Sequence, residues 1–334
     1  MYRAKKIINH PRNVVDELID GMVLAYHGSI RRIEGTGAIV RTEIADGKVG
    51  LVIGGGSGHE PLFHGLVGDN LADAAACGGI FAAPTPDTIL AAIKAADRGR
   101  GAVLVYGNYA GDNMNFDMAA ELADAEGIQT RTVRVWDDVA AAPKAEIDKR
   151  RGIAGDVFVI KIAGAAAATI AHLDEVHRIA SKARDNVRSL GVSIRAGSLP
   201  ETGELTFELA DDEIEIGMGA HGEPGVAREK LKPADALVDQ MLATILDDGL
   251  VRSGDEICLM LNDLGATTMM ELLIVNRRLR RNLGDQGINV FDTKIGSWLT
   301  TQEMAGFSIT IMKLDDELKT HYTMPARSWA WTSW

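Results

Sequence analysis

The ten residues from Leu51 to Glu60 hold the first side chains with an obvious capacity for chemistry. Three apolar residues predict the end of a buried strand, and Gly54 to Gly58 follow with a single serine among them. A strand-to-glycine turn of this kind lets the backbone approach a ligand without a Cβ in the way. The turn ends in His59, whose imidazole is suited to moving a proton at neutral pH. A glycine turn followed by a structural histidine is the alternative, and this segment alone does not decide between them.

Two further loops follow apolar runs in the same way. The second loop, 107–116, offers Asn108, Asp112 and Asn115, and the third, GAHGEPGV at 219–226, offers His221. Open α/β sheets build ligand sites at the carboxyl ends of their strands, which is where all three loops are expected. A carboxylate and two histidines can divide into a general base, an orienting partner and a covalent nucleophile.

Motifs of other chemistries do not fit the first loop. It lacks the Gly-x-Gly-x-x-Gly spacing of a dinucleotide site and the Lys-Ser/Thr ending of a P-loop. Ser57 does not stand in the Gly-x-Ser-x-Gly turn of a hydrolase nucleophile. His59, His64 and Asp112 could ligate a metal, but no HExxH or other tight spacing supports this, and no metal site is expected. The other histidines are expected to be solvated or to pack: His10, His27, His172, His177 and His321.

Alternating strand and helix patterns are expected to position the loops, which predicts α/β architecture with a largely parallel sheet. The run at 155–170 predicts a buried strand, a glycine break and the start of an alanine-rich helix. The preceding segment, 133–151, with its basic end, is expected to be an exposed connection. The expected strands are 38–41, 49–53, 102–106, 131–135, 214–218, 257–261, 288–293 and 308–314, and the expected helices are 14–27, 88–98, 114–126, 233–247 and 269–283.

At 334 residues the chain exceeds the size at which single cores usually divide. The sequence predicts two α/β domains, each a mainly parallel or mixed sheet flanked by helices. Residues 1–188 would hold the glycine-rich loop and the substrate site, and residues 189–334 would carry His221. The tail SWAWTSW, with Trp329 and Trp331, is expected to pack back on the first domain or to contact another subunit.

Composition narrows the class of protein. The net charge of −12 argues against nucleic acid as the main partner, because phosphate binding needs concentrated Lys and Arg. No apolar run is long enough to cross a membrane, and the first residues lack the apolar core of a signal peptide. The two cysteines, Cys77 and Cys258, are too few for a disulfide framework, so a reducing, cytoplasmic setting is expected.

Three motifs together resemble the K subunit of dihydroxyacetone kinase. They are GGGSGHEP at 54–61, the pattern NYxGDxMNF at 108–116 and GAHGEPG at 219–225. The segments 152–168, 263–272, 303–310 and 314–318 are also similar to that family, so the resemblance covers essentially the whole chain.

The resemblance implies a two-domain α/β protein, usually a homodimer, that captures a short ketose. The histidine matching His221 adds to the substrate carbonyl as a hemiaminal, and residues matching His59 and Asp112 handle the proton of the hydroxyl to be phosphorylated. The implied substrate-binding residues are Gly55, Gly56, Ser57, Gly58, Gly107 and Asn108.

In this family the phosphoryl group comes from outside the K subunit. The chain would bind no cofactor itself, because ATP and Mg²⁺ belong to a separate L subunit. That ATP is either exchanged freely or regenerated through a phosphotransferase-system phosphocarrier. The chain is therefore expected to be a kinase subunit that is active only with an L-type partner.

Two departures from the family pattern leave alternatives open. Gly107 stands where the family usually has a substrate-contacting lysine, and Asp69 stands where a second lysine is expected. Both changes would remove positive charge near the expected pocket, unless Lys161 occupies the space at Gly107. The substrate would then be dihydroxyacetone or a four-carbon or branched ketose. A ketose sensor or coactivator, and a sugar isomerase, remain as alternatives.

Overall fold

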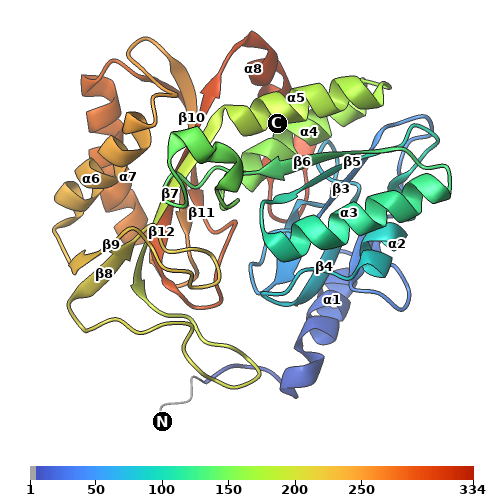
Figure 1. Cartoon of the computed structure of the whole chain (residues 1–334), viewed down its shortest axis with the longest axis horizontal. Helices are drawn as coiled ribbons and strands as arrows, with labels where there is room; N and C mark the ends of the chain where they lie inside the picture. Colours follow the sequence, from blue (N-terminus) through green and yellow to red (C-terminus); the bar gives the residue numbers. More distant parts are fainter. Residues whose placement is uncertain (1–4) are drawn as a thin grey trace. The chain divides into compact units, whose positions relative to one another are not determined.

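The computed structural model describes residues 5–334, which form two compact units (Figure 1). The N-terminal unit comprises residues 5–135, 156–185 and 318–334, and the C-terminal unit comprises residues 136–155 and 186–317. The expected single division at 188/189 therefore differs from these units. Residues 136–155 belong with the later half of the chain because they bond to it, for example through the Ser189 N–H that donates to the Asp137 carbonyl at 2.8 Å.

A mixed six-stranded sheet forms the centre of the N-terminal unit, in the order β1-β2-β4-β3-β5-β6. The strands β4, β3, β5 and β6 are parallel to one another, and β1 and β2 extend the sheet in antiparallel pairing. Their bounds are Ile30–Arg32 (β1), Ala38–Arg41 (β2), Gly50–Ser57 (β3), Ala74–Ile80 (β4), Ala102–Gly107 (β5) and Thr130–Val135 (β6).

Helices cover both faces of this sheet. One face packs against α2 and α3 through a core that includes Val52, Ala76 and Leu104 (Figure 1). The strand residues that point to the opposite face are also fully buried. On that face α4 and α5 contact β3, β5 and β6. The helices of this unit are Val14–Ala25 (α1), Pro86–Ala96 (α2), Ala110–Ala125 (α3), Asp156–Thr169 (α4), Leu173–Asp185 (α5) and, where the chain re-enters the unit, Asp316–Thr323 (α8).

The expected buried strand at the start of 155–170 is wrong, because this segment forms α4. Nearly all of its residues are buried, so it is apolar on every side, and an apolar run of that kind does not distinguish a strand from a buried helix. Small residues permit the close packing. A Cβ built on Gly164 would overlap the backbone at Leu71.

The C-terminal unit is built on a second mixed sheet, in the order β11-β10-β12-β7-β8-β9. Only β10 and β11 are parallel, and the other neighbours are antiparallel. Helices α6 and α7 pack on this sheet through one apolar core that includes Met241, Leu279 and Ile309. The bounds are Val187–Arg195 (β7), Glu213–Ile216 (β8), Ala227–Lys230 (β9), Ala234–Asp247 (α6), Glu256–Asp263 (β10), Met269–Asp285 (α7), Asn289–Gly296 (β11) and Ala305–Leu314 (β12).

The expectation that 133–151 is an exposed connection is wrong for three of its charged residues. Asp137, Asp138 and Arg150 are buried. Arg150 lies 2.6 Å from the carboxylate of Asp248, which Arg188 also contacts at 2.5 Å. Charges that are paired in this way can be buried, whereas hydropathy read along the sequence predicts exposure.

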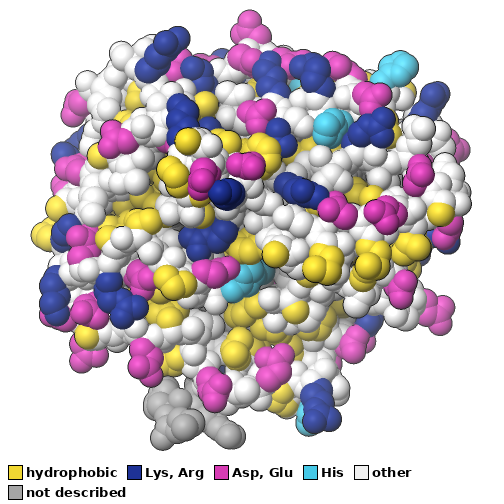
Figure 2. Space-filling model, in the orientation of Figure 1, with side chains coloured by type: hydrophobic (Ala, Val, Ile, Leu, Met, Phe, Trp, Pro, Cys, Tyr) yellow, Lys and Arg dark blue, Asp and Glu magenta, His cyan; other side chains and the backbone are white. Residues whose placement is uncertain are grey.

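Two properties of the described residues concern possible binding to membranes and nucleic acid. No helix among residues 5–334 is long and apolar enough to cross a membrane. On the face that Figure 2 shows, acidic and basic side chains are intermingled, with no continuous basic area of the kind that nucleic acid requires.

Candidate functional site

The glycines of the first loop stand at the carboxyl end of β3, and the space above them is filled by the protein itself. A Cβ on Gly54 would overlap the carbonyl of Ala76, and one on Gly55 would overlap the ring of Phe63. A Cβ on Gly56 would lie 2.8 Å from the backbone nitrogen of Ala82. Close packing of neighbouring segments requires these glycines, and the approach of a ligand to their backbone stays a prediction.

His59 follows this turn and is almost completely buried. Its ring lies 4.9 Å from the ring of Phe81, measured between centroids. Phe81 has a φ of 55°, a left-handed conformation that is rare for a bulky side chain and that tends to occur at functional sites. Beside them, the Ser57 hydroxyl donates to the Gly78 carbonyl at 2.7 Å, and the Gly58 N–H donates to the Glu60 carboxylate at 2.9 Å.

The second loop begins where β5 ends, next to the first loop in the sheet. Asn108 is fixed on one side by its N–H, which donates to the Val135 carbonyl at 2.9 Å. Its side-chain oxygen accepts from the Asn113 amide at 2.8 Å. Asp112 lies in the first turn of α3 and is buried, where the positive end of the helix dipole favours a carboxylate.

The first two loops lie close to each other, because a residue of each affects the pKa of Cys77 in β4. Burial raises the pKa of its thiol, and the charges of Glu60 and Asp112 raise this pKa further. Glu60 is the neighbour of His59, so the carboxylate of the second loop and the end of the first loop both act on one sulfur atom. The structure therefore brings the predicted residues His59 and Asp112 to the same end of adjacent strands.

Gly107, the position of the missing lysine, faces a carboxylate that the sequence did not reveal. A Cβ on Gly107 would lie 3.3 Å from Asp156 Oδ2 and 3.3 Å from the ring of Tyr109. Asp156 is buried at the first turn of α4. Lys161 does not occupy this space, because its ammonium donates to the His321 carbonyl at 2.8 Å. In the sequence, Asp156 could have been recognised as a candidate site residue because it is a carboxylate at the start of an apolar run.

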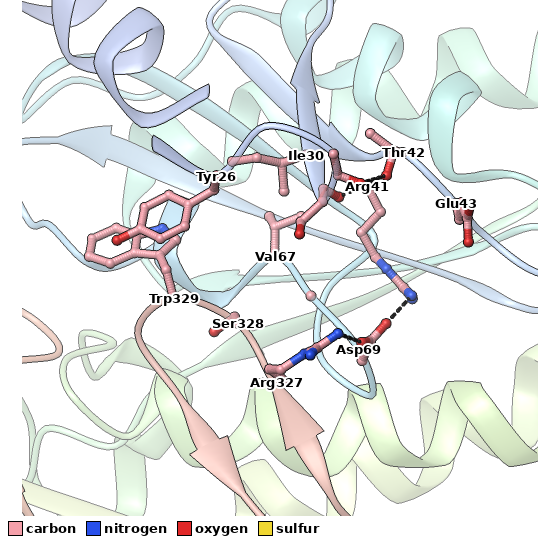
Figure 3. Close-up of a pocket in the computed structure, with 13 residues that line it drawn as sticks. Tyr26, Ile30, Arg41, Thr42, Glu43, Val67, Asp69, Arg327, Ser328 and Trp329 are labelled. Atoms are coloured by element: carbon pink, nitrogen blue, oxygen red, sulfur yellow. Dashed lines mark hydrogen bonds and ion pairs between the residues drawn. The ribbon is translucent and has the colours of Figure 1, made fainter. Parts of the chain in front are cut away.

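Asp69 does not lie near the glycine loop, and the expectation that it removes charge from that pocket is wrong. The segment after His59 runs back to the other end of the sheet, where the Asp73 N–H donates to the Leu51 carbonyl at the start of β3. Asp69 there contacts Arg41 at 2.5 Å and Arg327 at 3.4 Å (Figure 3).

His221 belongs to the C-terminal unit and is paired with a carboxylate two residues away. Its Nδ1 lies 3.0 Å from Glu223 Oε1, and its backbone N–H donates to Glu223 Oε2 at 2.9 Å. Burial raises the pKa of Glu223, but the hydrogen bond and charge of His221 outweigh burial and bring this pKa down to about 2. The carboxylate is therefore ionised at neutral pH and can only accept hydrogen bonds.

This pairing fixes which ring nitrogen carries the lone pair. An ionised carboxylate accepts from Nδ1, so Nδ1 carries the proton in the neutral imidazole, and Nε2 carries the lone pair. The sequence singled out His221 but not Glu223. The spacing His-x-Glu within a glycine-rich loop could have predicted that Glu223 pairs with His221.

The loop around His221 is held by two further side chains, Thr301 and Arg151. The Thr301 hydroxyl donates to the Ala220 carbonyl at 2.7 Å. Arg151 donates to the Gly217 carbonyl at 2.9 Å and to the Asp138 carboxylate at 2.8 Å. A Cβ on Gly219 would overlap Glu223 Oε2 and lie 2.6 Å from Arg151 Nη1, so a larger residue there would displace the ends of both side chains.

His59 and Asp112 lie in the N-terminal unit and His221 lies in the C-terminal unit. The meeting of all three residues in one site therefore stays a prediction. Among residues 5–334 no group of three or more His, Cys, Asp or Glu side chains is arranged to hold a metal ion, so the metal alternative for His59, His64 and Asp112 gains no support.

Comparison with known proteins identifies the family. The model of the Dak1 domain matches residues 20–330. The chain belongs to the Dak1 family. Among the relatives of this Dak1 protein, the dihydroxyacetone-binding subunit DhaK of PTS-dependent dihydroxyacetone kinase 1 from Listeria innocua is 44% identical over 94% of this chain and 95% of that protein. The L-erythrulose kinase of Pectobacterium atrosepticum is 38% identical over 96% of this chain, which spans 55% of that longer protein.

Solved structures of the family agree with this fold. The dihydroxyacetone kinase of C. freundii has a TM-score of 0.92 and 31% identity, covering 99% of this chain and 60% of that chain. A complex of the same kinase with AMP-PNP and Mg²⁺ has a TM-score of 0.91. The operon co-activator Dha-DhaQ has a TM-score of 0.89 and 29% identity, covering 95% of this chain and 98% of that one.

Proposed function

We propose that this Dak1 protein is the ketose-binding subunit of a short-ketose kinase and holds its substrate as a hemiaminal on His221. The observation that carries the proposal is the His221–Glu223 pair, because a carboxylate that accepts from Nδ1 leaves the lone pair of the neutral imidazole on Nε2, where it can act as a nucleophile. Relatives named for dihydroxyacetone and erythrulose support a ketose of three or four carbons as the substrate.

The covalent step needs no other reactant. The Nε2 lone pair of His221 forms a bond to the ketose carbonyl carbon, and the carbonyl π electrons move to oxygen. The oxygen gains a proton and Nδ1 loses one, so the net change is one proton transferred and no group lost. Glu223 stabilises the positive charge that the ring carries during the addition. The protein then gains the mass of one intact ketose.

The residues of the first two loops would act on the far end of the substrate. His59 and Asp112 would accept the proton of the hydroxyl that attacks the phosphoryl group, and the polar backbone of Gly55–Gly58 and Asn108 would bind hydroxyls. Both loops lie at the carboxyl ends of β3 and β5, where α/β sheets usually place such groups.

The phosphoryl group would come from a separate ATP-binding L-type subunit that carries Mg²⁺. Two observations support this division of labour. The first loop is not a P-loop. The chain also covers 95% of a relative that is named as the dihydroxyacetone-binding subunit of a kinase. A phosphotransferase-system phosphocarrier as the source of the phosphoryl group, and a homodimeric K subunit, are parts of the same proposal.

Intact mass spectrometry tests the covalent step directly. The chain is incubated with dihydroxyacetone or L-erythrulose, and the mass should rise by one ketose in wild type but not in His221→Ala. His172→Ala, which changes an exposed histidine, is the matched control and should keep the adduct. An adduct that persists in His221→Ala would overturn the proposal.

A second function has one specific observation in its favour. The close likeness to the co-activator Dha-DhaQ, together with the missing lysine at Gly107, is compatible with a protein that binds a ketose and reports it to a regulator. The two functions differ in one assay. With an L subunit and ATP present, a kinase subunit yields ketose phosphate, whereas a sensor retains unmodified ketose.

A further inference from the structure

The N-terminal unit contains a second candidate site, a pocket of about 450 Å³ (Figure 3). We call it the tail pocket, and its walls are Tyr26 and the segments 28–30, 41–43, 67–69 and 327–329. Asp73 pairs with Leu51 where β3 and β4 begin, and Asp69 lies just beyond, so the pocket opens at the start of these strands. The glycine loop lies at the other end of β3. The pocket therefore falls outside the site described above.

The wall formed by the C-terminal tail is firmly docked. Asp69 and Arg327 exchange two backbone hydrogen bonds, of 2.8 and 3.0 Å. The side-chain amide of Asn70 donates to the Pro325 carbonyl at 2.7 Å. A Cβ on Gly68 would overlap the Arg327 carbonyl, and one on Gly65 would lie 2.8 Å from Ala330 Cβ. Both glycines are thus required for the tail to lie where it does.

Four charged side chains line one end of the pocket and their formal charges cancel. The Asp69 carboxylate contacts Arg41 at 2.5 Å and Arg327 at 3.4 Å, and Glu43 supplies the second negative charge. The Arg327 side chain is 71% exposed. Within the described chain, the weak contact with Asp69 is its one ion pair, so most of its five N–H donors are available to a ligand.

The other end of the pocket is aromatic. The rings of Tyr26 and Trp329 stack with centroids 5.5 Å apart and planes 13° from parallel. Trp329 Nε1 is shielded from solvent and has no hydrogen-bond partner among residues 5–334. A buried donor of this kind costs stability unless a ligand or water accepts from it.

We propose that the tail pocket binds a neutral polyhydroxy compound, such as a cyclic sugar or a glycoside. An anion would face Asp69 and Glu43, and a cation would face Arg41 and Arg327, so the balanced charge favours neither. An apolar ligand would remove water from these charged groups without replacing the lost hydrogen bonds, which costs free energy. A sugar offers hydroxyls that both donate and accept at the charged end, and C–H faces that pack against the aromatic end.

The volume of the tail pocket also suits a larger ligand than the ketose of the proposed function. Pockets of about 300–1,000 Å³ usually hold ligands larger than a three- or four-carbon molecule. No histidine lines the tail pocket, so no imidazole is present there to add to a carbonyl group. Asp69 and the tryptophan tail, two features of the sequence that the kinase chemistry does not use, both form walls of this site.

Titration with carbonyl-free probes tests the inference independently of the ketose site. Methyl α-D-glucopyranoside, methyl β-D-xylopyranoside and myo-inositol cannot form an adduct with His221, and gluconate serves as the anionic comparison. Saturation-transfer NMR and calorimetry on the full chain should show binding of at least one neutral probe. Its affinity should fall about tenfold or more in Arg327→Ala and in Glu43→Gln, because each change removes a charged hydrogen-bonding group.

Two controls should bind the probe like wild type: His221→Ala, which removes the proposed nucleophile, and Arg252→Ala, which changes an exposed arginine of the other unit. Circular dichroism verifies folding, and the two pocket variants alter exposed side chains, so one of them suffices if the other fails to fold. The inference is overturned if no neutral probe binds, if only gluconate binds, or if a neutral probe binds the folded pocket variants as tightly as wild type.

Discussion

Glu223→Gln is the most informative single change in this protein, because it alters the partner of His221 with little change in shape. Glu223 accepts from both the Nδ1 and the backbone N–H of His221, at 3.0 and 2.9 Å. Glutamine can accept through one atom only, and its amide group can donate to Nδ1. The tautomer with the lone pair on Nε2 is then no longer fixed.

The magnitude follows from the hydrogen bonds. A hydrogen bond to a charged group contributes about 1.5–3 kcal/mol, which is about 10- to 150-fold in an equilibrium constant. The ketose concentration that half-saturates His221 should rise by that factor in Glu223→Gln. Glu223→Asp keeps the charge on a shorter side chain and should lie between the two. The measurement is the adduct fraction by intact mass across a ketose titration.

The matched control is Glu201→Gln, which makes the same chemical change at an exposed position of the same unit and should leave the titration unchanged. If Glu223→Gln forms the adduct at the wild-type ketose concentration, the carboxylate does not set the tautomer. The reasoning from the His221–Glu223 geometry would then be refuted.

The same carboxylate predicts a pH dependence of stability. The folded pKa of about 2 lies below the ordinary value of 4.5, so the stabilisation by Glu223 is complete above about pH 4.5 and is lost as the pH falls towards 2. The difference in unfolding free energy between wild type and Glu223→Gln should shrink over that range in urea titrations. A difference that stays constant from pH 6 to pH 3 would contradict the lowered pKa.

Three further predictions use other residues. Complete burial lowers the pKa of His64 to about 4 from 6.5, so wild type should lose up to about 3 kcal/mol of unfolding free energy between pH 6.5 and 4, and His64→Leu should not show this loss in urea titrations. Gly107→Lys places a long side chain beside Asp156 and should weaken erythrulose about tenfold more than dihydroxyacetone, measured by adduct titration. Gly219→Ala displaces the end of the Glu223 side chain and should reduce adduct formation as strongly as Glu223→Gln, with little change in melting temperature.

Each of these has an outcome that counts against it. Parallel pH profiles of wild type and His64→Leu would show that the imidazole is protonated in the folded protein. Equal effects of Gly107→Lys on both ketoses would show that the glycine does not enlarge the pocket. Gly191→Ala, where a Cβ has its nearest neighbour at 3.7 Å, is the control for Gly219→Ala and should keep full adduct formation.

The positions of the three loops could be predicted from the sequence because they depend on local pattern. Apolar β-rich runs that end in glycine gave the ends of β3 and β5 to within a few residues, and the alternation of elements gave the α/β class. Local pattern could not distinguish a strand from a helix in α4, because that helix is buried on all sides.

The partners of charged residues could not be predicted, because they depend on contacts distant in the chain. Asp69 pairs with Arg41 across 28 residues and with Arg327 across 258 residues. Without knowledge of these partners, the sequence places Asp69, which stands where the family usually has a lysine, at the wrong end of the sheet. Arg151 and the loop of His221 are likewise far apart in sequence, and only the folded chain places the guanidinium against Gly217.

The division of the chain into interleaved units restricts how this fold can be inherited. Each unit is assembled from separate stretches, with crossings after residues 135, 155, 185 and 317. A single recombination crossover between the first and the last crossing gives both units stretches from two different parents. Such a unit keeps its core and buried ion pairs only if both parents have matching residues, as Arg150 and Asp248 must match here. The two units are therefore expected to descend together, and substitutions that change the ketose should accumulate within loops rather than by exchange of whole units.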